Sequence, residues 1–251
     1  MSASDVFRGR KNLGGALLAE RRLSFFGHID ELRRRLTYII IAVIIAGSIG
    51  YFYADVILKI MIARLRPEFN LVYKSIMEPF MVRFKLGFLG GIIVTTPIIF
   101  YQILAFLAPA LKGREKRILY PIVFVMVLLF GMGASLGYFY VMPVAWTWLY
   151  TQGQDLGIIQ ILSATDFINF ITLFLLAFGL AFETPLVLAA LMRLKIVSRA
   201  TLRKNWRVAY VTILVIAAIA TPDWSLPPML ILGASMIALY EGTLFVARWW
   251  D

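Results

Sequence analysis

Residues 86–111 read LGFLGGIIVTTPIIFYQILAFLAPAL and contain no charged side chain over 26 positions. A helix crosses the hydrocarbon core of a bilayer with roughly 20 apolar residues, so this stretch is long enough to span a membrane. Charge-free stretches recur along the chain, at residues 36–54, 118–154, 167–182, 208–222 and 224–240. The sequence therefore predicts an all-α, polytopic membrane protein with six transmembrane helices.

The composition leads to the same class. Of the 251 residues, 61% are hydrophobic and only 16% are charged. A soluble domain has about half apolar and about a quarter charged residues, so this much apolar surface does not fit into one water-soluble core. The absence of cysteine and the single histidine, His28, argue against disulfides, thiolate chemistry and a metal site. Soluble-type catalytic motifs are also absent, and we expect neither an enzyme nor a cofactor.

The charges and prolines suggest boundaries for the spans. We expect a flexible cytoplasmic tail at residues 1–22, then a membrane domain at 23–251 with spans at about 36–54, 79–104, 117–141, 167–192, 206–221 and 227–247. Pro143 and the polar residues 151–155 predict that the third span leaves the membrane near Val141. The last two helices should be short. Residues 56–65 (VILKIMIARL) predict an amphipathic helix on the outer interface. Since the first apolar stretch begins after about 35 residues, we expect no cleavable signal peptide.

The basic residues predict the orientation. Nineteen of the 25 lysines and arginines lie before residue 36, in 112–117, in 193–207 or at Arg248, whereas the other six lie between residues 59 and 85. Cytoplasmic loops of membrane proteins are enriched in basic residues, so both termini should lie in the cytoplasm. These loops also account for the net charge of +11, so we expect no nucleic-acid partner.

Two acidic residues lie among bases near the predicted inner surface. Glu31 belongs to HIDELRRRL at 28–36, which predicts an amphipathic helix leading into the first span, and Glu115 belongs to KGREKR at 112–117. Each has a plain structural explanation. Glu31 can pair with Arg34 or Arg35 one helical turn later, and Glu115 can be a solvated loop residue.

A third acid lies deeper in the membrane. Glu183 precedes Arg193 by ten residues, which is roughly 15 Å along a helix. An acid at that depth costs at least ~2.5 kcal/mol on insertion scales, so Glu183 should face protein or water rather than lipid. Two interpretations are open: a hydrogen bond to a neighbouring helix, for instance to Gln102, or a function in a hydrated cavity.

Several motifs, in this order, resemble the TatC family, the core membrane component of twin-arginine protein translocation. The matching segments are HIDELR at 28–33, MEPF at 77–80, PIIFYQ at 97–102, FLAPAL at 106–111, EKR at 115–117, FG at 178–179, FETP at 182–185, RK at 203–204 and TPD at 221–223. The likeness covers about residues 24–247, and the stretch 101–117 is its most specific part.

The resemblance implies a cupped six-helix receptor that binds twin-arginine signal peptides of folded precursors at its cytoplasmic face. It further implies a location in the inner membrane of a prokaryote, single-span partners of the TatA and TatB type, self-association in a receptor complex, and transport driven by the protonmotive force. By position, it implies three groups of site residues: Glu31, Glu115, Phe106, Arg33 and Arg117 for the signal peptide; Glu183 and Gln102 in the intramembrane cavity; Thr221 and Asp223 for docking of partner helices.

Two other classes of function were weighed against the receptor. A small-solute or ion transporter could use Glu183 as a proton relay, and flux through liposomes that contain this chain alone would favour it. An intramembrane enzyme would need paired deep acids, a Ser/His pair or a metal cluster. The sequence offers one deep acid, and His28 lies outside the predicted span.

Overall fold

The computed structural model describes residues 3–63, 71–107, 119–154, 161–193, 195–221 and 226–249, and the side chains of the first helix from Gly27 onward. In chain order the elements are α1 (Ala3–Phe52), α2 (Ala54–Ile62), β1 (Leu71–Val72), α3 (Glu78–Leu107), α4 (Leu119–Leu136), η2 (Gly137–Val141), α5 (Met142–Gln154), β2 (Leu162–Ser163), α6 (Ala164–Ala181), α7 (Thr184–Arg193), α8 (Arg199–Lys204), α9 (Trp206–Ala220) and α10 (Leu226–Ala247). The expected all-α polytopic architecture is observed.

Five helical segments are long and apolar enough to cross a membrane within the described ranges. They are Gly27–Phe52, Glu78–Phe106, Tyr120–Gln152, Ala164–Met192 and Leu226–Ala247. The remaining expected span corresponds to α9, which is apolar but has only 15 residues, or roughly 22 Å of helix. α10 reaches 22 residues because the helix continues past Glu241.

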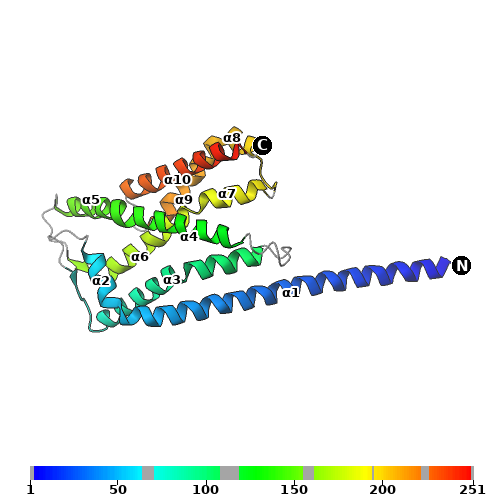
Figure 1. The fold of residues 1–251 in the computed structure, drawn as a ribbon, viewed down its shortest axis with the longest axis horizontal. Coiled ribbons are helices and arrows are strands. Elements are labelled where there is room, and N and C mark those ends of the chain that lie inside the picture. The colour runs from blue at the N-terminus through cyan, green and yellow to red at the C-terminus, as the bar shows by residue number, and fades with distance from the viewer. Residues whose placement is uncertain are drawn as a thin grey trace.

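Both termini lie at one end of the molecule, whereas α2 and the short strands lie at the other, which we call the far end (Figure 1). The backbone of α1 is helical from Ala3, and in Figure 1 this helix extends well beyond its neighbours. The domain boundary near residue 22 stays a prediction. The amphipathic helix expected at 56–65 is present as α2, which begins two residues earlier.

The helix of the third span does not end near Val141, and the point at which the span leaves the membrane stays a prediction. The helix continues from α4 through the π-helical turn η2 into α5 and ends at Gln154. The wider turn of η2 lies directly before Pro143, which has no N–H to donate to the helical ladder. The proline is thereby accommodated by a local change of helical pitch.

Glycines set the close contact between α1 and α3. A Cβ atom at Gly91 would lie 2.7 Å from the backbone nitrogen of Gly47, and one at Gly87 would lie 2.8 Å from the carbonyl oxygen of Gly47. Lipid tails are as apolar as leucine, so helices in a membrane associate largely through such close backbone packing. This contact lies in the half of α3 nearer the far end, and the candidate site lies toward the other end of the same helix pair.

The far end is joined by one buried carboxylate. Glu78, at the start of α3, accepts hydrogen bonds from the Ser163 hydroxyl and from the backbone N–H groups of Thr165 and Lys74. Next to it, β1 and β2 pair in parallel, with Leu71 opposite Leu162. Hydrogen bonds to a carboxylate favour its ionised form, so Glu78 acts as a fixed anion that ties two connecting segments to α3.

At the opposite end, α8 is attached to α10. The Arg199 Nε donates to the Leu244 carbonyl over 3.0 Å, and the Tyr240 hydroxyl donates to the Leu202 carbonyl over 2.9 Å. Glu241 accepts hydrogen bonds from Arg203 and from the Tyr210 hydroxyl. Glu241 is therefore paired within the protein.

Candidate functional site

A cluster of polar side chains joins α1 to α3 at the end that carries the termini. The Nε and Nη2 atoms of Arg35 donate to Oε1 of Glu31 over 3.0 and 2.5 Å, and Nη1 of Arg35 donates to Oε1 of Gln102 over 3.1 Å. The side chains of Arg35 and Glu31 are 18% and 28% exposed. The carboxylate is therefore reachable from solvent while the guanidinium holds it in place.

Glu31 keeps part of its hydrogen-bonding capacity. Arg35 uses two nitrogens on the single oxygen Oε1, and no donor among the described residues reaches Oε2. The guanidinium favours the charged form of the carboxylate. Of the two pairings expected from the sequence, the one with Arg35 is formed. Arg34 is exposed and, within the described part of the chain, makes no ion pair with Glu31.

An aromatic pair lies beside this cluster. The His28 ring, one turn before Glu31 on α1, stacks on the ring of Phe106 near the end of α3, with centroids 4.3 Å apart and planes inclined by 17°. His28 is exposed, and Phe106 is half-buried. Stacking fixes the orientation of Phe106, so the same end of the helix pair presents a carboxylate and an aromatic surface.

The remaining residues predicted at this surface fall into two groups. Arg33 is exposed on α1, on the part of the helix that also carries Glu31. Glu115 and Arg117 belong to residues 108–118, which lie outside the described residues. That segment joins the end of α3 to the start of α4. Its involvement in the site stays a prediction.

Glu183 lies at a break in the fourth span. α6 ends at Ala181 and α7 begins at Thr184, so Glu183 occupies the turn between them, ahead of Pro185. The residue is 6% exposed, and neither carboxylate oxygen has a hydrogen-bond partner within the described ranges. The hydrogen bond to Gln102 considered from the sequence is therefore not formed. The amide oxygen of Gln102 accepts from Arg35.

Thr221 is buried at the end of α9. It is 1% exposed, and its hydroxyl donates to the Ala217 carbonyl over 3.1 Å. The side chain is thus satisfied by its own helix rather than presented at the surface. Asp223, the other residue predicted to dock partner helices, lies outside the described residues.

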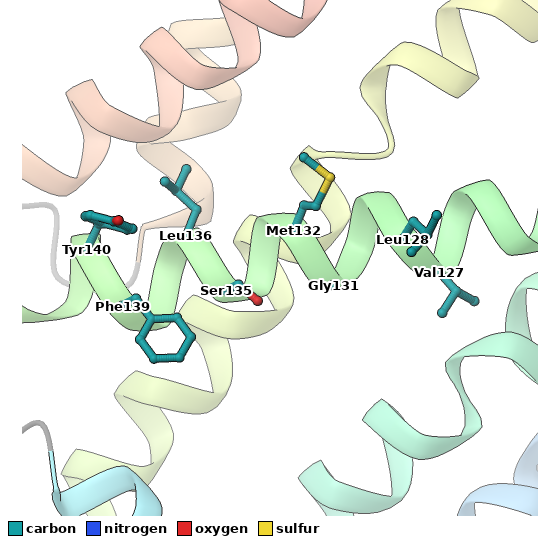
Figure 2. Close-up of a pocket in the computed structure, with 8 residues that line it drawn as sticks. All are labelled: Val127, Leu128, Gly131, Met132, Ser135, Leu136, Phe139 and Tyr140. Carbon is teal, nitrogen blue, oxygen red and sulfur yellow. The ribbon is translucent and has the colours of Figure 1, made fainter.

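An open apolar hollow runs along one face of α4 and η2 (Figure 2). Its lining comes from one continuous helical run: Val127, Leu128, Gly131, Met132, Ser135, Leu136, Phe139 and Tyr140. Glu183 is not part of this lining, so the expectation that it faces a hydrated cavity stays a prediction. The chemistry of the hollow suits an apolar chain or helix rather than a polar solute.

Sequence reasoning missed two residues of the site. Arg35 was considered only as a helical partner of Glu31, yet it also reaches Gln102, which is 67 positions away. His28 was considered only as an unlikely metal ligand, yet it stacks on Phe106. His28 and Arg35 lie three residues before and four residues after Glu31, so the sequence places all three on one face of a helix. The spacing does not determine which other helix that face contacts.

Together, the fold and the cluster define a multi-pass membrane protein with a charged and aromatic patch at one end of its helices. The family model described as Sec-independent protein translocase protein (TatC) matches residues 27–234. The chain therefore belongs to the TatC family. It is a subunit of a protein translocase in a prokaryotic inner membrane, and it is not an enzyme in the catalytic sense.

Individual relatives agree with this assignment. The chain is 32% identical over 232 residues to the translocase protein TatC of Carboxydothermus hydrogenoformans, covering 92% of this chain and 95% of that protein. It is 33% identical over 225 residues to TatC of Aquifex aeolicus, covering 88% and 93%. A crystal structure described as the twin arginine translocase receptor TatC superimposes with a TM-score of 0.74 at 33% identity, over 88% of this chain and 98% of that one.

Proposed function

We propose that this chain is the receptor subunit that binds the twin-arginine signal peptides of folded precursor proteins. The observation that carries the proposal is the Glu31 carboxylate, which is held against α3, is partly exposed, and has no donor to Oε2 among the described residues. A carboxylate with a free oxygen is a good acceptor for a guanidinium fork. Phe106 lies beside it and offers an apolar surface to the residues around the arginine pair.

A second carboxylate would complete the recognition of two arginines. In this proposal Glu115 supplies it, because the segment that contains Glu115 starts directly after α3. The bases Arg33 and Arg117 lie two residues after the two acids in sequence and would favour their ionised form. The apolar stretch of the signal peptide would then continue from this patch into the membrane.

The orientation of the chain follows from its charges. Nineteen of the 25 basic residues lie at the end that also carries both termini, or in loops predicted there. The positive-inside rule puts this end in the cytoplasm. Precursors are synthesised in the cytoplasm, so the proposed patch would face the compartment from which its ligands arrive.

The partners in this proposal are single-span proteins of the TatA and TatB type, which dock on α9 and α10, and further copies of the chain. The exposed face of α9 supports such docking through aliphatic side chains at helical spacing, namely Val208, Val211, Val215 and Ile219. Thr221 would mark the end of this face, with Asp223 beyond it. Transport would draw on the protonmotive force without ATP.

Peptide binding to the full chain in lipid nanodiscs tests the receptor function. A fluorescent signal peptide with an Arg-Arg pair should bind more tightly than the same peptide with Lys-Lys, and Glu31→Gln should weaken the Arg-Arg peptide several-fold. Asp30→Asn is the matched control, because it removes an equal charge from an exposed neighbouring position. Equal binding of both peptides, or an unaffected Glu31→Gln variant, would refute the proposal.

One observation favours a second function, a small-solute or ion transporter with Glu183 as proton relay. Glu183 is buried, and its carboxylate is unpaired among the described residues. Liposomes that contain only this chain would then acidify under an imposed gradient, and Glu183→Gln would abolish the flux. Proton-tight liposomes would exclude this function and leave the receptor proposal intact.

A further inference from the structure

Arg35 places an internal guanidinium on the carboxylate that the proposed function assigns to the signal peptide. Its three nitrogens are all engaged, two on Oε1 of Glu31 and one on Oε1 of Gln102. The contact therefore bridges α1 and α3, and it is more than an ordinary pair along one helix. Gln102 can hold the guanidinium in this position because its amide oxygen comes from a neighbouring helix.

From this geometry we infer that Arg35 is a specificity-determining residue, which makes Glu31 select arginine over lysine in the incoming peptide. This inference rests on the proposed receptor function. Arg35 cancels the formal charge of Glu31 at close range, so a second cation gains little from simple Coulomb attraction. Within the described part of the chain, Oε2 of Glu31 receives no donor, so it remains a directional acceptor for a well-placed N–H group.

The two cations differ in how they meet such an acceptor. An ammonium group is compact and strongly hydrated, so it needs net negative charge to offset the loss of its water. A guanidinium is planar and weakly hydrated, and it presents donors in a rigid fork. The guanidinium of the peptide can therefore donate to Oε2 next to the Arg35 side chain, with a small loss of hydration free energy. Arg35 thus weakens the binding of every cationic ligand somewhat, but it weakens the binding of lysine more than that of arginine.

Gln102 takes part as a positioning residue. Without its amide oxygen, Nη1 of Arg35 loses its acceptor on α3, and the guanidinium is free to leave Glu31 for solvent. The variant Gln102→Leu should therefore act in the same direction as loss of Arg35, with a smaller effect. A residue that merely stabilised the helix pair would change both peptides alike.

The experiment compares Arg-Arg and Lys-Lys signal peptides on the full chain in nanodiscs. Ion pairs that water can reach are weak, so removing Arg35 can strengthen binding by at most roughly fivefold. We expect Arg35→Gln to strengthen binding of the Lys-Lys peptide by about this factor and binding of the Arg-Arg peptide by less. The ratio of Arg-Arg to Lys-Lys affinity should therefore fall about two- to threefold. Arg35→Lys should restore part of the ratio.

Arg34→Gln is the matched control, because it removes the same charge from the exposed neighbouring position. It should strengthen both peptides equally or leave both unchanged. An Arg/Lys ratio that stays at the wild-type value in Arg35→Gln and in Gln102→Leu overturns the inference, as does a parallel loss of both peptides. The receptor proposal fails separately, if the wild-type chain does not distinguish the peptides or if Glu31→Gln binds like wild type.

Discussion

The ring of His28 stacks on the ring of Phe106 with centroids 4.3 Å apart, although the two residues belong to α1 and α3. The stack fixes the side of Phe106 that remains open to a ligand. It also places an aromatic surface within one helical turn of the Glu31–Arg35 pair.

Loss of this stack should weaken binding of the signal peptide without unfolding the chain. His28→Ala leaves Phe106 free to rotate, and an aromatic pair contributes about 0.5–1.5 kcal/mol, so we expect about two- to tenfold weaker binding. Binding of the Arg-Arg peptide to nanodiscs measures the effect. His28→Phe retains a ring at this position and should retain the affinity. Equal weakening in both variants would contradict a stacking function.

Packing between α1 and α3 should tolerate no side chain at Gly91. A leucine there must displace the Gly47 backbone, and overpacking of this kind costs about 1–3 kcal/mol. Thermal unfolding in detergent should show a lower midpoint for Gly91→Leu. Gly131→Leu is the control, because a Cβ atom at Gly131 meets nothing within 4 Å. Equal unfolding midpoints for the two variants would show that the close packing of α1 and α3 at Gly91 does not contribute to stability.

The Glu78 carboxylate should protect the far end from opening. Glu78→Gln weakens the hydrogen bonds from Ser163, Thr165 and Lys74, because a neutral amide accepts less strongly than a carboxylate. We expect several-fold faster hydrogen exchange at the Thr165 and Lys74 amides. Ser163→Ala removes one of the three bonds and should produce a smaller change. Unchanged exchange at both amides in Glu78→Gln would mean that the carboxylate does not hold these segments.

Glu183 should lower the folding stability of the chain and yet be needed for export. Its carboxylate is buried without a partner among the described residues, and an unsatisfied buried polar group costs about 1–3 kcal/mol. Glu183→Leu should therefore raise the unfolding midpoint while it lowers export of a folded reporter with an Arg-Arg signal. Leu180→Ala, at an exposed position on α6, should change neither quantity strongly. A lower midpoint in Glu183→Leu would show that the acid is satisfied in the membrane.

The sequence alone determined the class of protein and the approximate positions of its helices. The free energy of placing a segment in lipid is approximately a sum over its side chains. Membrane spans and their orientation can therefore be predicted from charge-free stretches and loop charges without knowing the fold. The span through Glu183 to Met192 was predicted in this way. The motifs around residues 101–117 indicated the family for the same reason, since they are local in sequence.

Only the tertiary structure decided which helical faces meet. The spacing of Glu31, Arg35 and His28 places them on one face of α1, but the packing of α1 against α3 brings Gln102 and Phe106 to that face. In the same way, Glu78 meets Ser163 across 85 positions. Such pairings depend on the packing of whole helices, which is set by many weak contacts together and by no single motif.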